Sequence, residues 1–215
     1  MSELDFACVD AVVDRYAAAP TLTLRLNVTD TGGQPVHGLM LRCHLRIQPR
    51  RRSYSEGEAA RLRDVFGGPG EWGRGLRPLS LAQVSLTVPP FHGTTELDLP
   101  VPFTYDFEVA ATKYLHGVRD GDIPLELLFS GTIFRRGDQG FTVDQVPWDR
   151  EATYQLPVRV WREMMDHYFP DAGWVRLRSA TIDALHAFRS RSALPTWDDA
   201  VLHLLGQAAE VGDDV

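Results

Sequence analysis

The sequence predicts a mainly β protein of the α+β type, an antiparallel immunoglobulin-like or C2-like β-sandwich followed by a C-terminal helical segment. Three observations lead to this prediction. Apolar and polar side chains alternate over the first three quarters of the 215 residues, which is the period of half-buried strands. Turn residues separate the alternating runs, and no helix long enough for a parallel crossover lies between them. From Val158 onward the apolar residues recur at helical spacing.

The alternation is clearest in TLTLRLNVTD, where Leu22, Leu24 and Leu26 share one side. The same pattern predicts strands in the runs FACVDAVV, LMLRCHLRI, VSLTV, ELDLPVPF, YDFEVAA, IPLELLFSGTIF, FTVDQV and TYQL. About eight or nine short strands joined by turns favour a sandwich, and a closed barrel is the alternative. Pro100 and Pro102 lie in one strand pattern and lack the N–H that a ladder needs, so they predict an edge strand or a bulge there.

Helical patterns set the predicted domain organisation. The run SYSEGEAARLRDVFGG predicts a short helical insertion at about residues 55–67, with Ser55 and Glu58 as a capping box and Gly67 as its end. Three more helices are predicted in VRVWREMMDHYF, SATIDALHAFRSR and PTWDDAVLHLLGQA. We therefore predict a β-sandwich over residues 1–157 and a helical segment over residues 158–215. So short a segment holds little core, and we expect it to pack on the sandwich or on a partner.

Composition excludes several classes of function. The net charge of −7 argues against nucleic-acid binding, which requires a basic surface. Cys8 and Cys43 are the only cysteines and no CxxC spacing occurs, so we expect buried free thiols and neither a zinc site nor an iron–sulfur cluster. No apolar run reaches the roughly twenty residues of a membrane span, and no leader pattern opens the chain. The expectation is a cytoplasmic protein without a membrane span.

No catalytic signature stands out. The sequence has no GxSxG elbow and no HExxH pair, and Ser130 lies in the middle of a strand pattern. We therefore predict no catalytic residue and no cofactor. One alternative is an unrecognised hydrolase or small-ligand enzyme at the sandwich–helix junction, where His116 would have to converge with Asp120 or Asp122.

Loop aspartates raise a second alternative, a calcium-dependent C2-like binding module. Asp120 and Asp122, with Asp30 and Asp138 in other loops, are the residue type that holds calcium in such sandwiches. Aspartates are also preferred in tight turns for their own local hydrogen bonds. The turn interpretation is favoured, and no metal site is predicted.

Two further patterns have competing interpretations. The glycine-rich run FGGPGEWGRGLRP follows a helix rather than preceding one, so we interpret it as a long flexible insertion and not as a phosphate-binding loop. Arg25, Arg42, His44 and Arg46 point outward from two strands that we expect to be neighbours. They form either a basic face for an acidic ligand or cross-strand ion pairs on a solvated sheet, and ion pairing is favoured.

Aromatic residues and methionines are dense after residue 148. Such side chains are the usual anchors of protein interfaces, and they also fix small helical segments to a sheet. The possible protein interface consists of Trp161, Met164, Met165, Tyr168, Trp174 and Trp197.

Three long runs carry a family resemblance: FEVAATKYLHGVRDGDIPLELLFSGTIF, VPWDREATYQLPVRVWREMMDHYFPDAGW and ALPTWDDAVLHLL. They resemble a family of uncharacterised actinobacterial proteins of about this length, over nearly the whole chain. The resemblance brings no active site. It implies a genomic context beside nickel–iron uptake hydrogenase genes, and hence a hydrogenase subunit or maturation protein as partner. The sequence thus predicts a non-catalytic protein-binding accessory or scaffold protein.

Overall fold

A computed structural model describes residues 4–103, 109–137, 140–171, 175 and 177–212. The described residues form antiparallel strands in two sheets. The strands are β1 (Leu4–Val13), β2 (Thr21–Asp30), β3 (Val36–Ile47), β4 (Leu79–Val88), β5 (Thr94–Pro102), β6 (Asp122–Gly137), β7 (Gly140–Gln145) and β8 (Glu151–Pro157).

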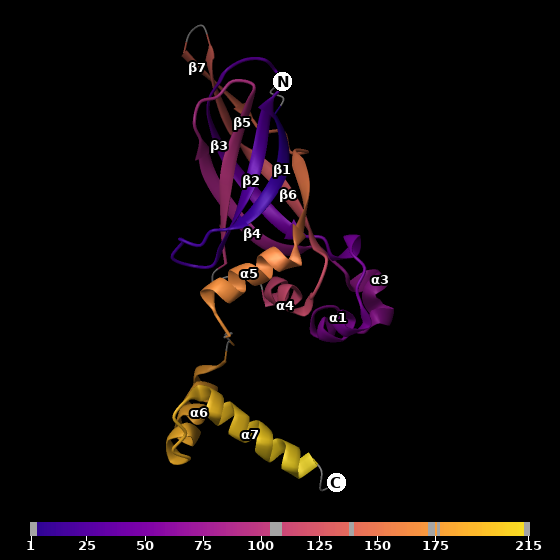
Figure 1. The fold of residues 1–215 in the computed structure, drawn as a ribbon. Coiled ribbons are helices and arrows are strands. Elements are labelled where there is room, and N and C mark those ends of the chain that lie inside the picture. The colour runs from indigo at the N-terminus through magenta and orange to yellow at the C-terminus, as the bar shows by residue number, and fades with distance from the viewer. Residues whose placement is uncertain (1–3, 104–108, 138–139, 172–174, 176, 213–215) are drawn as a thin grey trace. The chain divides into compact units, whose positions relative to one another are not determined.

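The two sheets lie face to face, as Figure 1 shows. One has the order β1-β2-β5, and the other has the order β4-β3-β6-β7 with β8 also paired to β6. Between the sheets, the ring of Phe6 on β1 stacks on Phe129 of β6 with centroids 4.2 Å apart. The predicted mainly β, sandwich-like α+β fold is confirmed. Within the described residues β5 is an edge strand, as Pro100 and Pro102 predict.

Short helices follow β3 in the chain. The segment after β3 contains η1 (Pro49–Arg51), α1 (Glu56–Arg61), α2 (Arg63–Phe66), η2 (Pro69–Glu71) and α3 (Trp72–Gly75). The capping box of α1 is present as predicted, because Ser55 Oγ accepts from the Glu58 N–H and the Glu58 side chain accepts from the Ser55 N–H. Gly67 ends α2 at a φ of 76°, a conformation that glycine adopts without strain.

The alternating pattern in YDFEVAA is misleading. Residues 105–108 lie outside the described residues, but Val109–Ala111 begin a helix, α4 (Val109–Gly117), and not a strand. The buried residues Ala111, Tyr114, Leu115 and Val118 recur at helical spacing, and this longer pattern decides the conformation.

The chain divides into two compact units, residues 1–171 and 172–215. Helix α5 (Val158–Tyr168) belongs to the first unit, because its buried residues Val158, Val160, Trp161 and Met164 pack among the core of the sandwich. The division therefore falls after α5, whereas the sequence predicts it before α5.

The second unit is a helical hairpin made of α6 (Ser179–Arg191) and α7 (Trp197–Gly212). A capping box begins α7, since Thr196 Oγ1 accepts from the Asp199 N–H and an Asp199 carboxylate oxygen accepts from the Thr196 N–H, both at 3.0 Å. Across the described part of the chain, no helix is both long and apolar enough to cross a membrane.

Candidate functional site

The structure divides the residues of the predicted interface between the two units. Trp161 and Met164 are buried, with 5% and 0% of their surface exposed. Met165 and Tyr168 are partly buried against the same core. Trp197 begins α7 in the hairpin and is 43% exposed, and Trp174 lies outside the described residues. Among the described residues of this set, Trp197 has the largest exposed fraction. The interface stays a prediction.

Helix α5 is fixed to the sandwich by aromatic and hydrogen-bonding contacts. The Trp161 ring lies 5.0 Å from that of Phe103 and 5.9 Å from that of His116, measured between centroids. The Tyr168 hydroxyl is 2.6 Å from the carbonyl oxygen of Asp14 and 2.9 Å from that of Ala17, in the loop between β1 and β2. These contacts assign the buried face of α5 to the fold of the chain itself.

The hairpin presents an apolar stripe along α7. Trp197, Val201, Leu204 and Leu205 recur at the spacing that places residues on one side of a helix. Their exposed fractions are 43%, 44%, 36% and 61%. Ala200 is the single hydrophobic residue of α6 and α7 that is fully buried among those the structure describes. The two helices therefore do not cover each other's apolar surface.

Charge and ring contacts organise the edge of this stripe. The guanidinium of Arg189, in the last turn of α6, lies over the Trp197 ring at 4.3 Å from its centroid. His186 contacts the same ring edge-on. The first turn of α7 carries Asp198 and Asp199. The stripe thus has an acidic border at the start of α7 and a basic border at the end of α6.

At the sandwich–helix junction the residues of the hydrolase alternative do not form a cluster. His116 contacts the Trp161 ring, and burial lowers the pKa of its imidazole, with a smaller effect from the charge of Arg119. Within the described residues no hydrogen bond or ion pair joins His116 to Asp120 or Asp122. The backbone carbonyls of both aspartates instead accept hydrogen bonds from Arg52.

The cysteines and the loop aspartates do not form a reactive or metal-binding site among the described residues. Burial raises the pKa of the Cys8 and Cys43 thiols to about 12, so neither is a thiolate nucleophile at neutral pH. Asp30, one of the four loop aspartates, forms a buried ion pair with Arg135 at 2.5 Å. Asp138 lies outside the described residues. In the described part of the chain, no group of three or more His, Cys, Asp or Glu side chains is placed to hold a metal ion.

The outward-facing arginines separate into paired and unpaired ones. Strands β2 and β3 belong to different sheets, so the expected shared basic face does not form. Arg25 on β2 pairs with Asp10 at 3.3 Å, and Arg46 on β3 pairs with Glu126 at 2.5 Å. These two bear out cross-strand ion pairing. Arg42 on β3 has no hydrogen bond or ion pair to another described residue.

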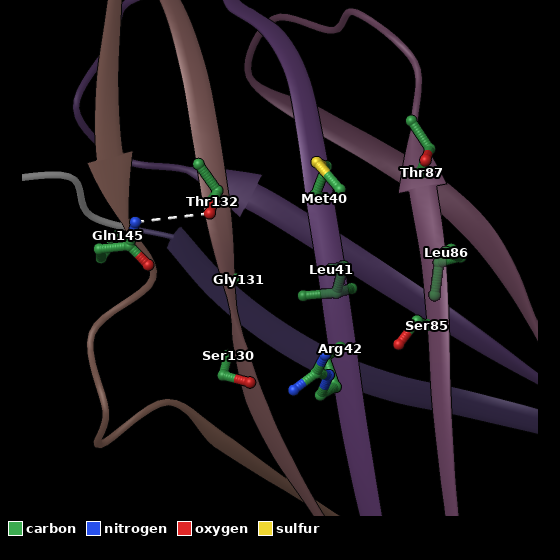
Figure 2. A pocket seen from close by; sticks show the side chains of 10 residues that line it. All are labelled: Met40, Leu41, Arg42, Ser85, Leu86, Thr87, Ser130, Gly131, Thr132 and Gln145. Atoms are coloured by element: carbon green, nitrogen blue, oxygen red, sulfur yellow. Dashed lines mark hydrogen bonds between the residues drawn. The ribbon is translucent and has the colours of Figure 1, made fainter.

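Arg42 lines a groove of about 450 Å³ on the outer face of the second sheet. Its lining residues come from β3, β4, β6 and β7 and are labelled in Figure 2. The cross-strand neighbours of Arg42 are Ser85 on β4 and Ser130 on β6. Gly131 forms part of the lining, and a Cβ there would lie 2.1 Å from the carbonyl oxygen of Met40, so only glycine permits this spacing of β3 and β6.

The glycine-rich loop borders a separate pocket. Its lining includes Gln48, Arg50 and Arg77, and the Arg50 guanidinium donates a hydrogen bond to the carbonyl oxygen of Gly73 at 3.0 Å. Trp72 anchors the loop, because its indole N–H donates to the Gly67 carbonyl and its ring contacts Tyr54 edge-on. The loop thus carries an aromatic side chain back to the core.

Comparison with known proteins places this architecture in a family. A family model described as "Family of unknown function (DUF6084)" matches residues 1–213. The chain belongs to the DUF6084 family. No curated protein matches the chain. The DUF6084 assignment supports the predicted resemblance to an uncharacterised family, and it assigns no activity.

Comparison of this DUF6084 chain with solved structures finds matches of low TM-score. One is the solution structure of a late embryogenesis abundant (LEA)-type protein, with 13% identity, a TM-score of 0.30 and 72% of each chain covered. Another is β-glucosidase 3B from Thermotoga neapolitana, with 9% identity and a TM-score of 0.26 over 72% of this chain and 17% of the enzyme. At these TM-scores neither likeness carries a conclusion about this chain.

Proposed function

We propose that the protein is a non-catalytic accessory or scaffold protein that binds another protein through the apolar stripe of α7. The observation that carries the proposal is the exposure of Trp197, Val201, Leu204 and Leu205 on one side of a helix. Contiguous apolar surface rimmed by polar residues is typical of sites that bind proteins. Trp197 supplies the kind of large aromatic side chain that dominates the energy of protein interfaces.

The stripe defines the chemistry of the partner. A helix with apolar residues at i, i+4, i+7 and i+8 fits against an amphipathic helix or an apolar groove. Asp198 and Asp199 at the border of the stripe favour a partner with basic residues beside its apolar face. The genomic context that the family resemblance implies makes a hydrogenase subunit or maturation protein the first partner to test.

Affinity purification of tagged full-length protein from its native host, followed by mass spectrometry, tests the proposal with two variants. Val201→Glu places a charge in the stripe. Ala187→Glu is the matched control, because it places the same charge at an exposed position of the hairpin that belongs to α6 and not to the stripe. We expect Val201→Glu to reduce recovery of the partner about tenfold or more, as loss of an interface anchor does, and Ala187→Glu to retain it.

The comparison of variants decides the result. A protein that is captured by the wild type and by Ala187→Glu but not by Val201→Glu supports the stripe as its binding site. Circular dichroism must show equal helix content in both variants. Capture that is lost with Ala187→Glu and kept with Val201→Glu, or no capture at all, contradicts the proposal.

A further inference from the structure

We propose a second binding site in the first compact unit: the groove around Arg42 binds a small hydroxylated organic oxyanion, of the sugar-acid or sugar-phosphate class. The oxyanion contacts Arg42, and the hydroxyl groups of the ligand contact the polar side chains along the sheet. Three observations carry this proposal. The charge of Arg42 has no partner among the described residues, serines lie on its two sides, and a second row of polar residues lies about one sugar ring away along the strands.

The first observation is a contrast between arginines on the same kind of surface. Arg25 has the carboxylates of Asp10 and Asp98 at its cross-strand positions, and Arg46 has Glu126 at its own. At these positions the sheet supplies the counter-charge. Arg42 has serines at both cross-strand positions, so its guanidinium fork is left to pair with an anion from solution.

The second observation concerns those serines. Ser85 and Ser130 lie on either side of Arg42 in Figure 2, on the strands that flank β3. A serine hydroxyl can donate a hydrogen bond to an oxyanion that a guanidinium already holds. One cation between two hydroxyl donors therefore matches the several acceptor lone pairs of a carboxylate or phosphate group.

The third observation is the adjacent row on the same face. Thr87, Met40, Thr132 and Gln145 are cross-strand neighbours on β4, β3, β6 and β7, one row away from Arg42. Gln145 Nε2 donates to Thr132 Oγ1 at 3.4 Å, as drawn in Figure 2. Two residues along a strand span about 6.6 Å. A ligand bound at Arg42 reaches these hydroxyl and amide groups with a ring of hydroxylated carbons.

The shape and composition of the groove agree with such a ligand. Its volume of about 450 Å³ lies within the range of small-molecule sites. Apart from Arg42 the polar lining is uncharged, which suits the hydroxyl groups of a sugar. The thioether of Met40, a residue that is 57% exposed, provides an apolar contact for the C–H face of the ring.

A titration of the full-length protein followed by amide chemical shifts tests the site. The probes are glucuronate, glucose 6-phosphate, glucose and acetate. We expect saturable shifts at Arg42 and at Ser130–Thr132 with one or both hydroxylated oxyanions, and binding at least about threefold weaker for glucose and for acetate, which each lack one half of the recognised chemistry. Glucuronate and glucose 6-phosphate together distinguish a sugar acid from a sugar phosphate as the preferred source.

Matched variants separate a site from a general effect of charge. Arg42→Gln should weaken binding about tenfold or more, because it removes the charged hydrogen bonds to the oxyanion. Arg136→Gln is the control, since Arg136 is exposed like Arg42 but lies on β6, outside the groove. Equal weakening by both variants, acetate binding as tightly as the hydroxylated oxyanions, or no saturable shift with any probe each overturns the proposal.

Discussion

The two compact units use the same residue types in opposite ways. In the first unit Trp161 is 5% exposed and packs between Phe103 and His116. In the hairpin Trp197 is 43% exposed and is covered on one face by Arg189. Both tryptophans lie on amphipathic helices. The difference is the layer beneath them, because two stacked sheets supply a core for α5 and a pair of helices supplies almost none for α7.

An aromatic-rich segment has different roles next to a sandwich and on a two-helix unit. A cluster of Trp, Tyr and Met next to a sandwich contributes first to the core of that sandwich. The same residues on a two-helix unit have too few neighbours to become buried. Candidate interface residues are therefore better chosen from the unit without a core, and the contrast can be tested by truncating one tryptophan in each unit.

Trp161→Ala should cause the largest loss of stability. Removing a buried tryptophan leaves a cavity and costs about 3–5 kcal/mol in the free energy of unfolding. Trp197→Ala should cost about 1 kcal/mol or less, since surface substitutions remove few contacts. Urea unfolding of the full-length protein, followed by far-ultraviolet circular dichroism, measures both variants under the same conditions.

Equal losses of stability for the two variants would contradict this difference in burial, because they would mean that Trp197 is as buried as Trp161 in the isolated protein. A loss of stability for Trp197→Ala that appears only in the presence of a binding partner would support this difference in burial. The partner would then supply the neighbours that the hairpin lacks, as binding to the native state stabilises a protein.

The sequence predicted the strands and the C-terminal helices because each of them has several periods of its pattern. It misassigned Val109–Ala111, where a short alternating run precedes the helical spacing of Tyr114, Leu115 and Val118. A brief pattern fits both periods, and packing against the rest of the chain decides between them.

The Arg42 groove and the exposure of the stripe of α7 could not be predicted from the sequence, because both depend on how the elements pack. Arg25 and Arg42 look alike in the sequence, and only the strand order and register show that one faces aspartates and the other faces serines. The stripe of α7 is visible as a helical pattern. Its exposure is not, because exposure depends on which elements pack against the helix.

The two capping boxes extend the same comparison to charged groups. In the first unit, the Glu58 carboxylate accepts from the Arg52 guanidinium at 2.5 Å and from the Arg119 N–H at 2.7 Å, in addition to its cap. Burial alone would raise the pKa of Glu58. The hydrogen bonds from the Arg119 and Ser55 N–H groups, with the charge of Arg52, outweigh burial and hold the pKa below its ordinary value.

Glu58→Gln should cost about 3 kcal/mol at neutral pH, because it breaks a buried ion pair. The folded-state pKa of Glu58 is lowered, so its stabilising contribution is complete above the ordinary carboxylate pKa and is lost as the pH falls through the folded-state value. The difference in stability between wild type and Glu58→Gln should therefore narrow on acidification. Urea unfolding of both proteins from neutral to acidic pH measures this, and a constant difference would assign the loss to packing instead.

The capping box of α7 should contribute less to stability than the capping box of α1. The Asp199 carboxylate bonds only to the Thr196 N–H and hydroxyl among the described residues; Thr196 is exposed and Asp199 is half-buried. Thr196→Ala should cost about 1 kcal/mol, the usual value of an N-cap, and reduce the helix content of the hairpin. Circular dichroism measures the helix content, and the urea transition of the sandwich should stay where it is. If that transition moved as well, the hairpin would contribute to the stability of the sandwich, and the two units would have to be treated as one cooperative structure.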